Sequence, residues 1–245
     1  MKALICIVVC CSLVSCDGSF QSFFKPNNST TAVSVIKDDT DSTLPQPRAA
    51  DVMPLFNLSD RTAQNGFIFR ERSISNTSLN PTRQYYVKRG EFMDDENSRI
   101  SELKAFKNKV IRYIDSLVET PKPKSNSLVY QTILSELDAL VQTKAENKYM
   151  IIYSYMLQNS DEFSYYKKSD VLQAQLHPEQ VVARFEKMGK LPDLTGVKVF
   201  VICNPGSYEN EKKINLSIAT FRALIEAKNG TLVLASNMNP EVSAK

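Results

Sequence analysis

The sequence predicts an α/β fold, a three-layer sandwich in which a mainly parallel central sheet with one antiparallel hairpin lies between helices. Three observations predict this class. Continuous apolar runs at residues 148–154, 197–203 and 231–236 have the composition of strands that are buried on both faces. Amphipathic helical stripes separate these runs. Strands that alternate with helices in this way are typical of a parallel sheet covered on both faces.

The first three strands are predicted early in the domain. Residues 52–58 (VMPLFNL) form an apolar run, which we interpret as a buried strand. Residues 66–75 alternate between apolar and polar side chains and predict a second strand, and residues 83–88 predict a third. Asn80 and Pro81 lie between these two strands and indicate a turn, so we expect an antiparallel hairpin.

Four helices are predicted from apolar residues that recur at three- and four-residue steps. The first covers residues 97–118, and an acidic run before it suits the positive end of its dipole. The second begins near Val129. The third has Pro178 at its first position and ends at Gly189. The fourth carries the stripe at residues 214–225, just before the last strand.

Three polar segments follow predicted strands. They are Asn57–Arg61, Ser154–Asn159 and Asn204–Ser207. Ligands of open α/β sheets bind beyond the carboxyl ends of the strands, so we expect these segments to converge at one edge of the sheet.

The amino-terminal sequence predicts export and a lipid anchor. Lys2 precedes an apolar segment at residues 3–14 that is too short to span a bilayer. Residues 13–16 (LVSC) resemble the bacterial lipobox, which implies cleavage before Cys16 and lipidation of its sulfur. Two or three acyl chains hold a protein on a membrane. The alternative is an ordinary secretory signal with an incidental cysteine.

The composition predicts three regions. Residues 1–15 are the signal peptide, residues 16–50 are the lipidated cysteine and a polar, flexible tether, and residues 51–245 are the α/β domain. The whole chain has a formal net charge of +3, and loss of the signal removes Lys2. This balance does not favour nucleic acid as a partner. Cys203 is the one cysteine within the predicted domain, which excludes a disulfide inside it.

Four stretches resemble the von Willebrand factor A-type (VWA) domain. In this sequence they are NLSDR (57–61), SNSLVYQTI (125–133), MIIYSYMLQNS (150–160) and LPDLTGVKVFVIC (191–203). The resemblance implies a metal-ion-dependent adhesion site at the sheet edge. It also implies a helix between the first strand and the hairpin. Since few residues separate 52–58 from the hairpin, either that helix is deleted or residues 52–58 are not the first strand.

The ligand positions implied by this resemblance are degenerate. Asn57 and Tyr155 stand where the family has aspartates, and Arg61 stands at a serine position. Mg²⁺ prefers carboxylates, an amide and a phenol are neutral, and an arginine repels a cation. We therefore expect no metal and no other cofactor. The degenerate set is Asn57, Ser59, Arg61, Ser127 and Tyr155. If an ion binds, Asp60 and Ser59 ligate it; otherwise Asp60 pairs with Arg61.

No catalytic residue is expected. His177 is the only histidine and precedes Pro178, where a helix is predicted to begin. The function expected is that of a bacterial envelope lipoprotein, not an enzyme, which is held on a membrane through Cys16 and binds an envelope protein. The alternative is an envelope enzyme or small-ligand-binding protein that uses the loops at residues 154–159 and 204–207.

Overall fold

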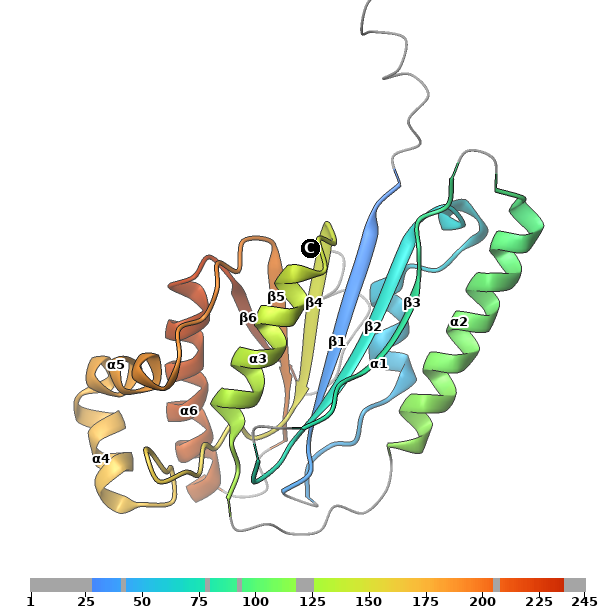
Figure 1. Ribbon diagram of the computed structural model, residues 1–245. Coiled ribbons are helices and arrows are strands. Elements are labelled where there is room, and N and C mark those ends of the chain that lie inside the picture. Colours follow the sequence, from blue (N-terminus) through green and yellow to red (C-terminus); the bar gives the residue numbers. More distant parts are fainter. Residues whose placement is uncertain are drawn as a thin grey trace, which may run out of the picture.

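The computed structural model describes residues 28–40, 43–77, 80–91, 94–117, 126–204 and 208–235 (Figure 1). It confirms the predicted α/β class, with a central sheet between layers of helices. In the described residues the strands have the order β3-β2-β1-β4-β5-β6, and only β3 is antiparallel to its neighbour. The strands are β1 (Thr30–Asp38), β2 (Gly66–Ile74), β3 (Arg83–Val87), β4 (Asn147–Tyr153), β5 (Val197–Ile202) and β6 (Thr231–Ala235). The helices are α1 (Ala49–Phe56), α2 (Glu96–Ser116), α3 (Val129–Gln142), α4 (Lys168–Leu176), α5 (Pro178–Met188) and α6 (Tyr208–Glu226).

The prediction of a flexible tether over residues 16–50 is wrong for its second half. Residues 30–38 form β1, which pairs in parallel with β2 on one side and with β4 on the other. β1 is buried along nearly its whole length. The polar side chains that made this segment resemble a tether have partners inside the fold; for example, the Ser34 hydroxyl donates to Glu136 Oε1 at 2.9 Å. The predicted signal peptide and Cys16 lie outside the described residues.

Residues 52–58 are not a strand, which corrects a second prediction. α1 covers most of this run, and its buried residues Val52, Leu55 and Phe56 have helical spacing. A short apolar run does not by itself distinguish a buried strand from a buried helix. Of the two explanations for the missing helix, the structure supports the second, because the first strand is β1 and α1 lies between it and the hairpin.

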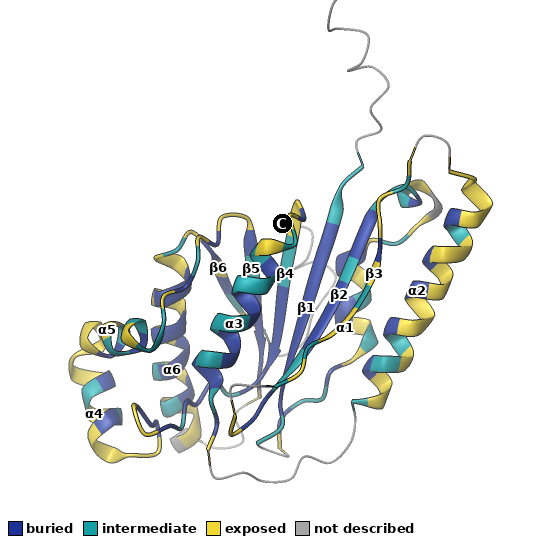
Figure 2. Ribbon diagram, in the orientation of Figure 1, coloured by how far each residue is buried: buried dark blue, intermediate teal, exposed yellow. Residues whose placement is uncertain are grey.

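The two faces of the sheet carry separate apolar layers. Figure 2 shows that the central strands between them are largely buried. Ala32 and Ile36 of β1 face the layer that is formed with α3, α5 and α6. Val33 and Val35 face the opposite layer, which is formed with α1 and α2. The helices α4 and α5 pack against α6 at one side of the sheet (Figure 1).

Helix α4 was not predicted. Its apolar residues form no single stripe, because Ala174 is buried whereas Leu172 and Leu176 are exposed. Asp170 is also buried, and its carboxylate accepts a hydrogen bond from the Ser164 backbone N–H at 2.9 Å. A helix held by a polar contact rather than by an apolar face leaves little periodic signal.

Gly196, in the turn before β5, has a left-handed backbone with φ of +78°. A Cβ placed there meets no atom within 4 Å, so the backbone alone opposes a side chain. We expect Gly196→Ala to lower the free energy of unfolding by about 1–2 kcal/mol, measured by urea denaturation. Gly196→Asn should cost less, because asparagine tolerates this region better. Equal stability of the alanine variant and the wild type would contradict the prediction.

Candidate functional site

The carboxyl edge of the sheet is organised by Asp38, the last residue of β1. Its Oδ1 accepts hydrogen bonds from the backbone N–H and the hydroxyl of Thr40, at 3.0 and 2.6 Å. Its Oδ2 accepts from the Ser154 hydroxyl at 2.7 Å, just beyond the end of β4. Asp38 and Ser154 are both buried. The ends of the two central strands are therefore held together through one carboxylate.

Two of the loops predicted to converge meet beside this carboxylate. Ser127 and Asn159 form a bridge in which each backbone N–H donates to the other's carbonyl, at 3.0 and 2.9 Å. The Tyr155 hydroxyl donates to the Asn204 carbonyl at 3.1 Å. The Ser127 hydroxyl is buried and has no hydrogen-bond partner in the structure. The rest of the predicted segment Asn204–Ser207, residues 205–207, lies outside the described residues.

Residues 57–61 do not reach this edge, so the predicted convergence is wrong for that segment. α1 begins beside the end of β4, where the Tyr153 hydroxyl donates to Asp51 Oδ2 at 2.9 Å, and it runs back toward the start of the strands. Asn57 follows α1 with φ of 48° and lines a cavity together with Thr31, near the start of β1. Asn57 is thus at the opposite edge from Ser127 and Tyr155.

The degenerate metal set therefore does not form one site. Ser59 and Arg61 are exposed near the amino edge, and the Ser59 N–H donates to the Thr62 hydroxyl at 2.9 Å. The side chain of Asp60 is outside the description, and so is its predicted pairing with Arg61. Within the described ranges, no group of three or more acidic, histidine or cysteine side chains is placed to hold a metal ion.

A buried polar cluster lies beside the carboxyl edge, on the α2 side of the sheet. Lys37 Nζ is 3.1 Å from Asp39 Oδ1 and donates to the Leu117 carbonyl at 2.6 Å. The Tyr113 hydroxyl donates to Glu71 Oε2 at 2.6 Å. Burial raises the pKa of Glu71, and the nearby charge of Asp39 raises it further, against the lowering effect of the Tyr113 hydrogen bond. Burial and the contact with Glu71 also raise the pKa of Tyr113.

The raised pKa of Glu71 predicts a pH effect on stability. The folded chain binds the Glu71 proton more tightly than the unfolded chain does. This carboxyl therefore lowers the free energy of unfolding as pH rises from about 4.5 through its folded pKa. We expect Glu71→Gln to lose less stability than the wild type between pH 4.5 and 7, measured by urea denaturation at each pH. The same dependence of stability on pH in Glu71→Gln and in the wild type would refute the assignment.

Two residues singled out in the sequence have ordinary environments. His177 lies between α4 and α5, and its exposed ring has Nδ1 3.7 Å from Glu179 Oε1. Cys203 is buried, and burial raises the pKa of its thiol to about 11. A thiol of that pKa is almost wholly protonated near neutral pH.

No family model and no curated protein matches the chain. The solved structures that are similar to it include the following two. A D319A mutant of the PilB minor pilin from Streptococcus sanguinis has a TM-score of 0.46 and 13% identity, over 88% of this chain and 59% of that one. The human COPII-coat protein Sec24c has a TM-score of 0.31 and 7% identity, over 85% of this chain and 30% of that one. The chain thus spans less than two thirds of either protein.

These comparisons contradict the expected membership of the VWA family. The structural matches are described as a minor pilin and a coat protein, not as VWA domains, and the similarity is weak. The structure also removes one of the four stretches on which the resemblance was based, since NLSDR (57–61) follows a helix and not the first strand. Among the helices of the described ranges, none combines the length and apolar character needed to cross a membrane.

Proposed function

We propose that the chain is a lipoprotein of a bacterial cell envelope whose α/β domain binds another envelope protein without catalysis. The observation that carries this proposal is the sequence LVSC at residues 13–16, at the end of an apolar segment of signal-peptide length. A lipidated Cys16 anchors the chain, and the folded domain is the part that remains free to interact.

The position of β1 sets how close the domain would lie to the membrane. The 13 residues from 17 to 29 separate Cys16 from Thr30. Fully extended, they reach at most about 45 Å, and as a coil about 20 Å. β1 begins at the amino edge of the sheet, so the proposed anchor joins the domain at this edge and not at the carboxyl edge.

An exposed apolar surface supports a protein partner. Tyr166, Leu172 and Leu176, which we call the α4 surface, are 60%, 54% and 59% exposed. Leu172 and Leu176 lie one turn apart on α4. Figure 1 shows α4 at the end of the molecule opposite to the start of β1. Two exposed leucines one turn apart on a helix offer an apolar contact to a partner protein, and this position is remote from the proposed anchor.

The anchor is tested by labelling. In a bacterial host, the wild-type chain should incorporate a radiolabelled fatty acid and sediment with membranes. Cys16→Ala should lose the label and become soluble, because a thioether-linked lipid requires this sulfur. Cys203→Ala is the matched control and should keep both properties. Label and membrane retention in Cys16→Ala would overturn the proposed anchor.

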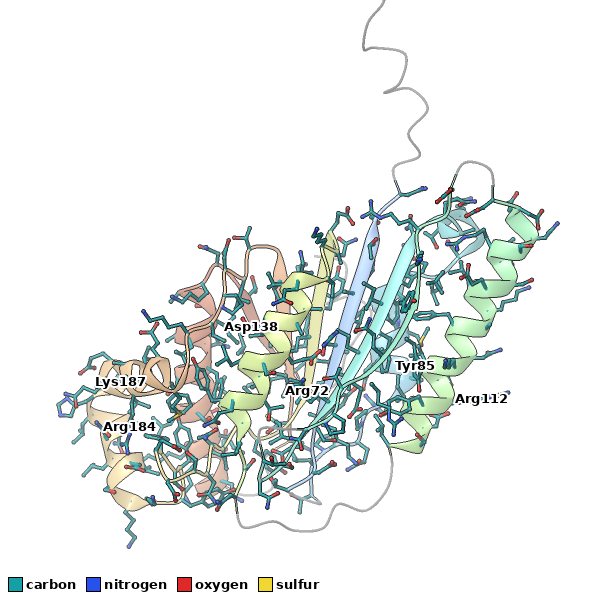
Figure 3. The ribbon with its side chains drawn as sticks, viewed as in Figure 1. Arg72, Tyr85, Arg112, Asp138, Arg184 and Lys187 are labelled. Atoms are coloured by element: carbon teal, nitrogen blue, oxygen red, sulfur yellow. The ribbon has the colours of Figure 1, made fainter. Side chains whose placement is uncertain are left out.

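The α4 surface is tested by site-specific cross-linking of the membrane-anchored chain. A photoreactive residue at position 172 should give one major adduct with an envelope protein, whereas the same residue at exposed Arg112 on α2 should not (Figure 3). The partner identified from the adduct should then bind the purified chain at least about tenfold more weakly when Leu176→Ser is introduced. Identical adducts from both positions, no adduct, or unchanged affinity in Leu176→Ser would contradict the proposal.

A second candidate function, small-ligand binding, is favoured by one observation. A cavity of about 400 Å³ opens at the amino edge of the sheet. This is within the volume range of ligand pockets in proteins. It is at the opposite edge from the loops at residues 154–159 and 204–207, which the sequence favoured for this role.

A further inference from the structure

The cavity lies where the end of α1 approaches the first residues of β1 and β4. Asn57 lies beyond the last turn of α1, Thr31 belongs to β1, and Asn147 and Tyr149 belong to β4. Asn65 closes it from the loop before β2. Four separate segments therefore build its wall, and three of them are fixed by the central sheet or by α1.

The wall is rich in neutral hydrogen-bonding groups. Amides are supplied by Asn57, Asn65 and Asn147, and hydroxyls by Ser29, Thr31, Thr62 and Tyr149. The Asn147 amide makes a long contact of 3.4 Å to the Thr31 hydroxyl. Within the described residues, the side-chain amide of Asn57 and the hydroxyl of Tyr149 make no hydrogen bond. Each amide can both donate and accept, and a hydroxyl can do the same.

The base of the cavity is apolar and includes an aromatic ring. Leu55 and Phe56 are buried on α1. The Tyr149 ring is half-buried, and the Phe200 ring lies behind it with a centroid distance of 6.5 Å. A tyrosine offers an apolar face together with a polar end, which suits a ligand that is apolar on one side and hydroxylated at its rim.

The described lining residues carry no charge. A charged ligand would lose its hydration here without gaining an ionic partner from these side chains, which is costly. An entirely apolar ligand would cover the Asn57 side-chain amide and the Tyr149 hydroxyl without giving them a partner. We propose that this cavity binds an uncharged saccharide, with the sugar ring on Tyr149 and its hydroxyls on the asparagine amides. The proposal does not depend on the lipid anchor or on a protein partner.

Calorimetric titration tests this proposal with the full chain, purified in a detergent without a sugar head group. The probes are the N-acetylglucosamine trimer and maltotriose as uncharged saccharides, trigalacturonic acid as a charged one, and adenosine as a nucleoside. We expect at least one uncharged trisaccharide to bind and to slow hydrogen exchange at residues 54–65 and 147–149. Trigalacturonic acid should bind at least about tenfold more weakly.

Substitutions of lining residues test whether a saccharide binds in this cavity or elsewhere on the surface. Tyr149→Ala should weaken binding at least about tenfold, and Tyr149→Phe, which keeps the ring, should weaken it less. Asn57→Gly removes an amide while keeping the left-handed backbone allowed, and it should weaken binding several-fold. Asn97→Ala, on the exposed start of α2, is the matched control and should bind normally. The proposal is overturned if neither saccharide binds at millimolar concentration, if adenosine or the charged trisaccharide binds more tightly, or if the pocket variants match Asn97→Ala.

Discussion

A chain that begins at Asp51 is expected not to fold, whereas a chain that begins at Asn28 should unfold cooperatively. Only the longer chain contains β1, which pairs with β2 over residues 30–38 and with β4 over residues 31–37. Without β1 the sheet separates into a β3-β2 hairpin and a β4-β5-β6 unit. The loss should remove all of the stability of the domain, which is about 5–15 kcal/mol for a typical domain.

The two truncated chains can be compared by circular dichroism and urea denaturation. We expect a sigmoidal transition for the longer chain and no cooperative transition for the shorter one. Addition of a synthetic peptide of residues 28–50 to the shorter chain should restore part of the signal, since the peptide supplies the missing strand. A cooperative transition in the chain that begins at Asp51 would show that β1 is dispensable.

Substitution of Glu136 should have the largest effect of any single side chain considered. Glu136 is fully buried on α3, and its Oε1 is 2.5 Å from Arg70 Nε. Its Oε2 is 3.5 Å from the Nε of Arg72, which is labelled in Figure 3. Glu136→Ala leaves buried positive charge without its partner and should lower the free energy of unfolding by about 3–5 kcal/mol. Urea denaturation measures this loss.

A surface pair provides the control for Glu136. Arg222 and Glu226 form an ion pair one turn apart on α6, with Nε and Oε1 3.8 Å apart, and both side chains are about half exposed to solvent. Glu226→Ala should change stability by no more than about 1 kcal/mol. In a triple variant with Arg70→Met, Arg72→Met and Glu136→Leu, stability should recover relative to Glu136→Ala, since the unpaired charges are removed. Similar losses for Glu136→Ala and Glu226→Ala would contradict a role for the buried network.

Much of the fold could be predicted because its elements have strong periodic or continuous apolar patterns. The prediction of residues 97–118 agrees with α2 (96–116), and its N-cap Asp95 accepts from the Ser98 N–H at 2.8 Å, in the acidic run. β4, β5 and β6 match their predicted runs to within one residue at either end. These elements are determined by local sequence and by burial, and the pattern of apolar residues in a single sequence indicates both.

The elements that were missed depend on partners distant in the sequence. β1 carries Ser34 and Lys37, whose polar groups are bound by Glu136 and by the Leu117 carbonyl. Both partners are distant in the sequence, so the residues around β1 give no sign of these contacts. Residues 30–38 therefore resembled a linker. α1 is too short for its period to be distinguished from that of a strand.

The carboxyl-edge site was missed for the same reason. Asp38 follows the apolar residues of β1, and the short run AVSVI before KDDTDS was a usable signal. An apolar run that ends in oxygen-bearing side chains also occurs at residues 52–61, and the predicted site was placed there instead. The meeting of Tyr155 with Asn204 could be expected because the ends of adjacent parallel strands share an edge.

The central place of β1 also governs the order of events during biosynthesis. The chain emerges amino end first, and Thr31 must wait for Asn147 before the two central strands can pair. Such distant pairing gives a high contact order and slow folding. A nascent chain of this protein therefore stays incompletely folded until more than half of it has been made, a state in which it remains accessible to chaperones and to export machinery.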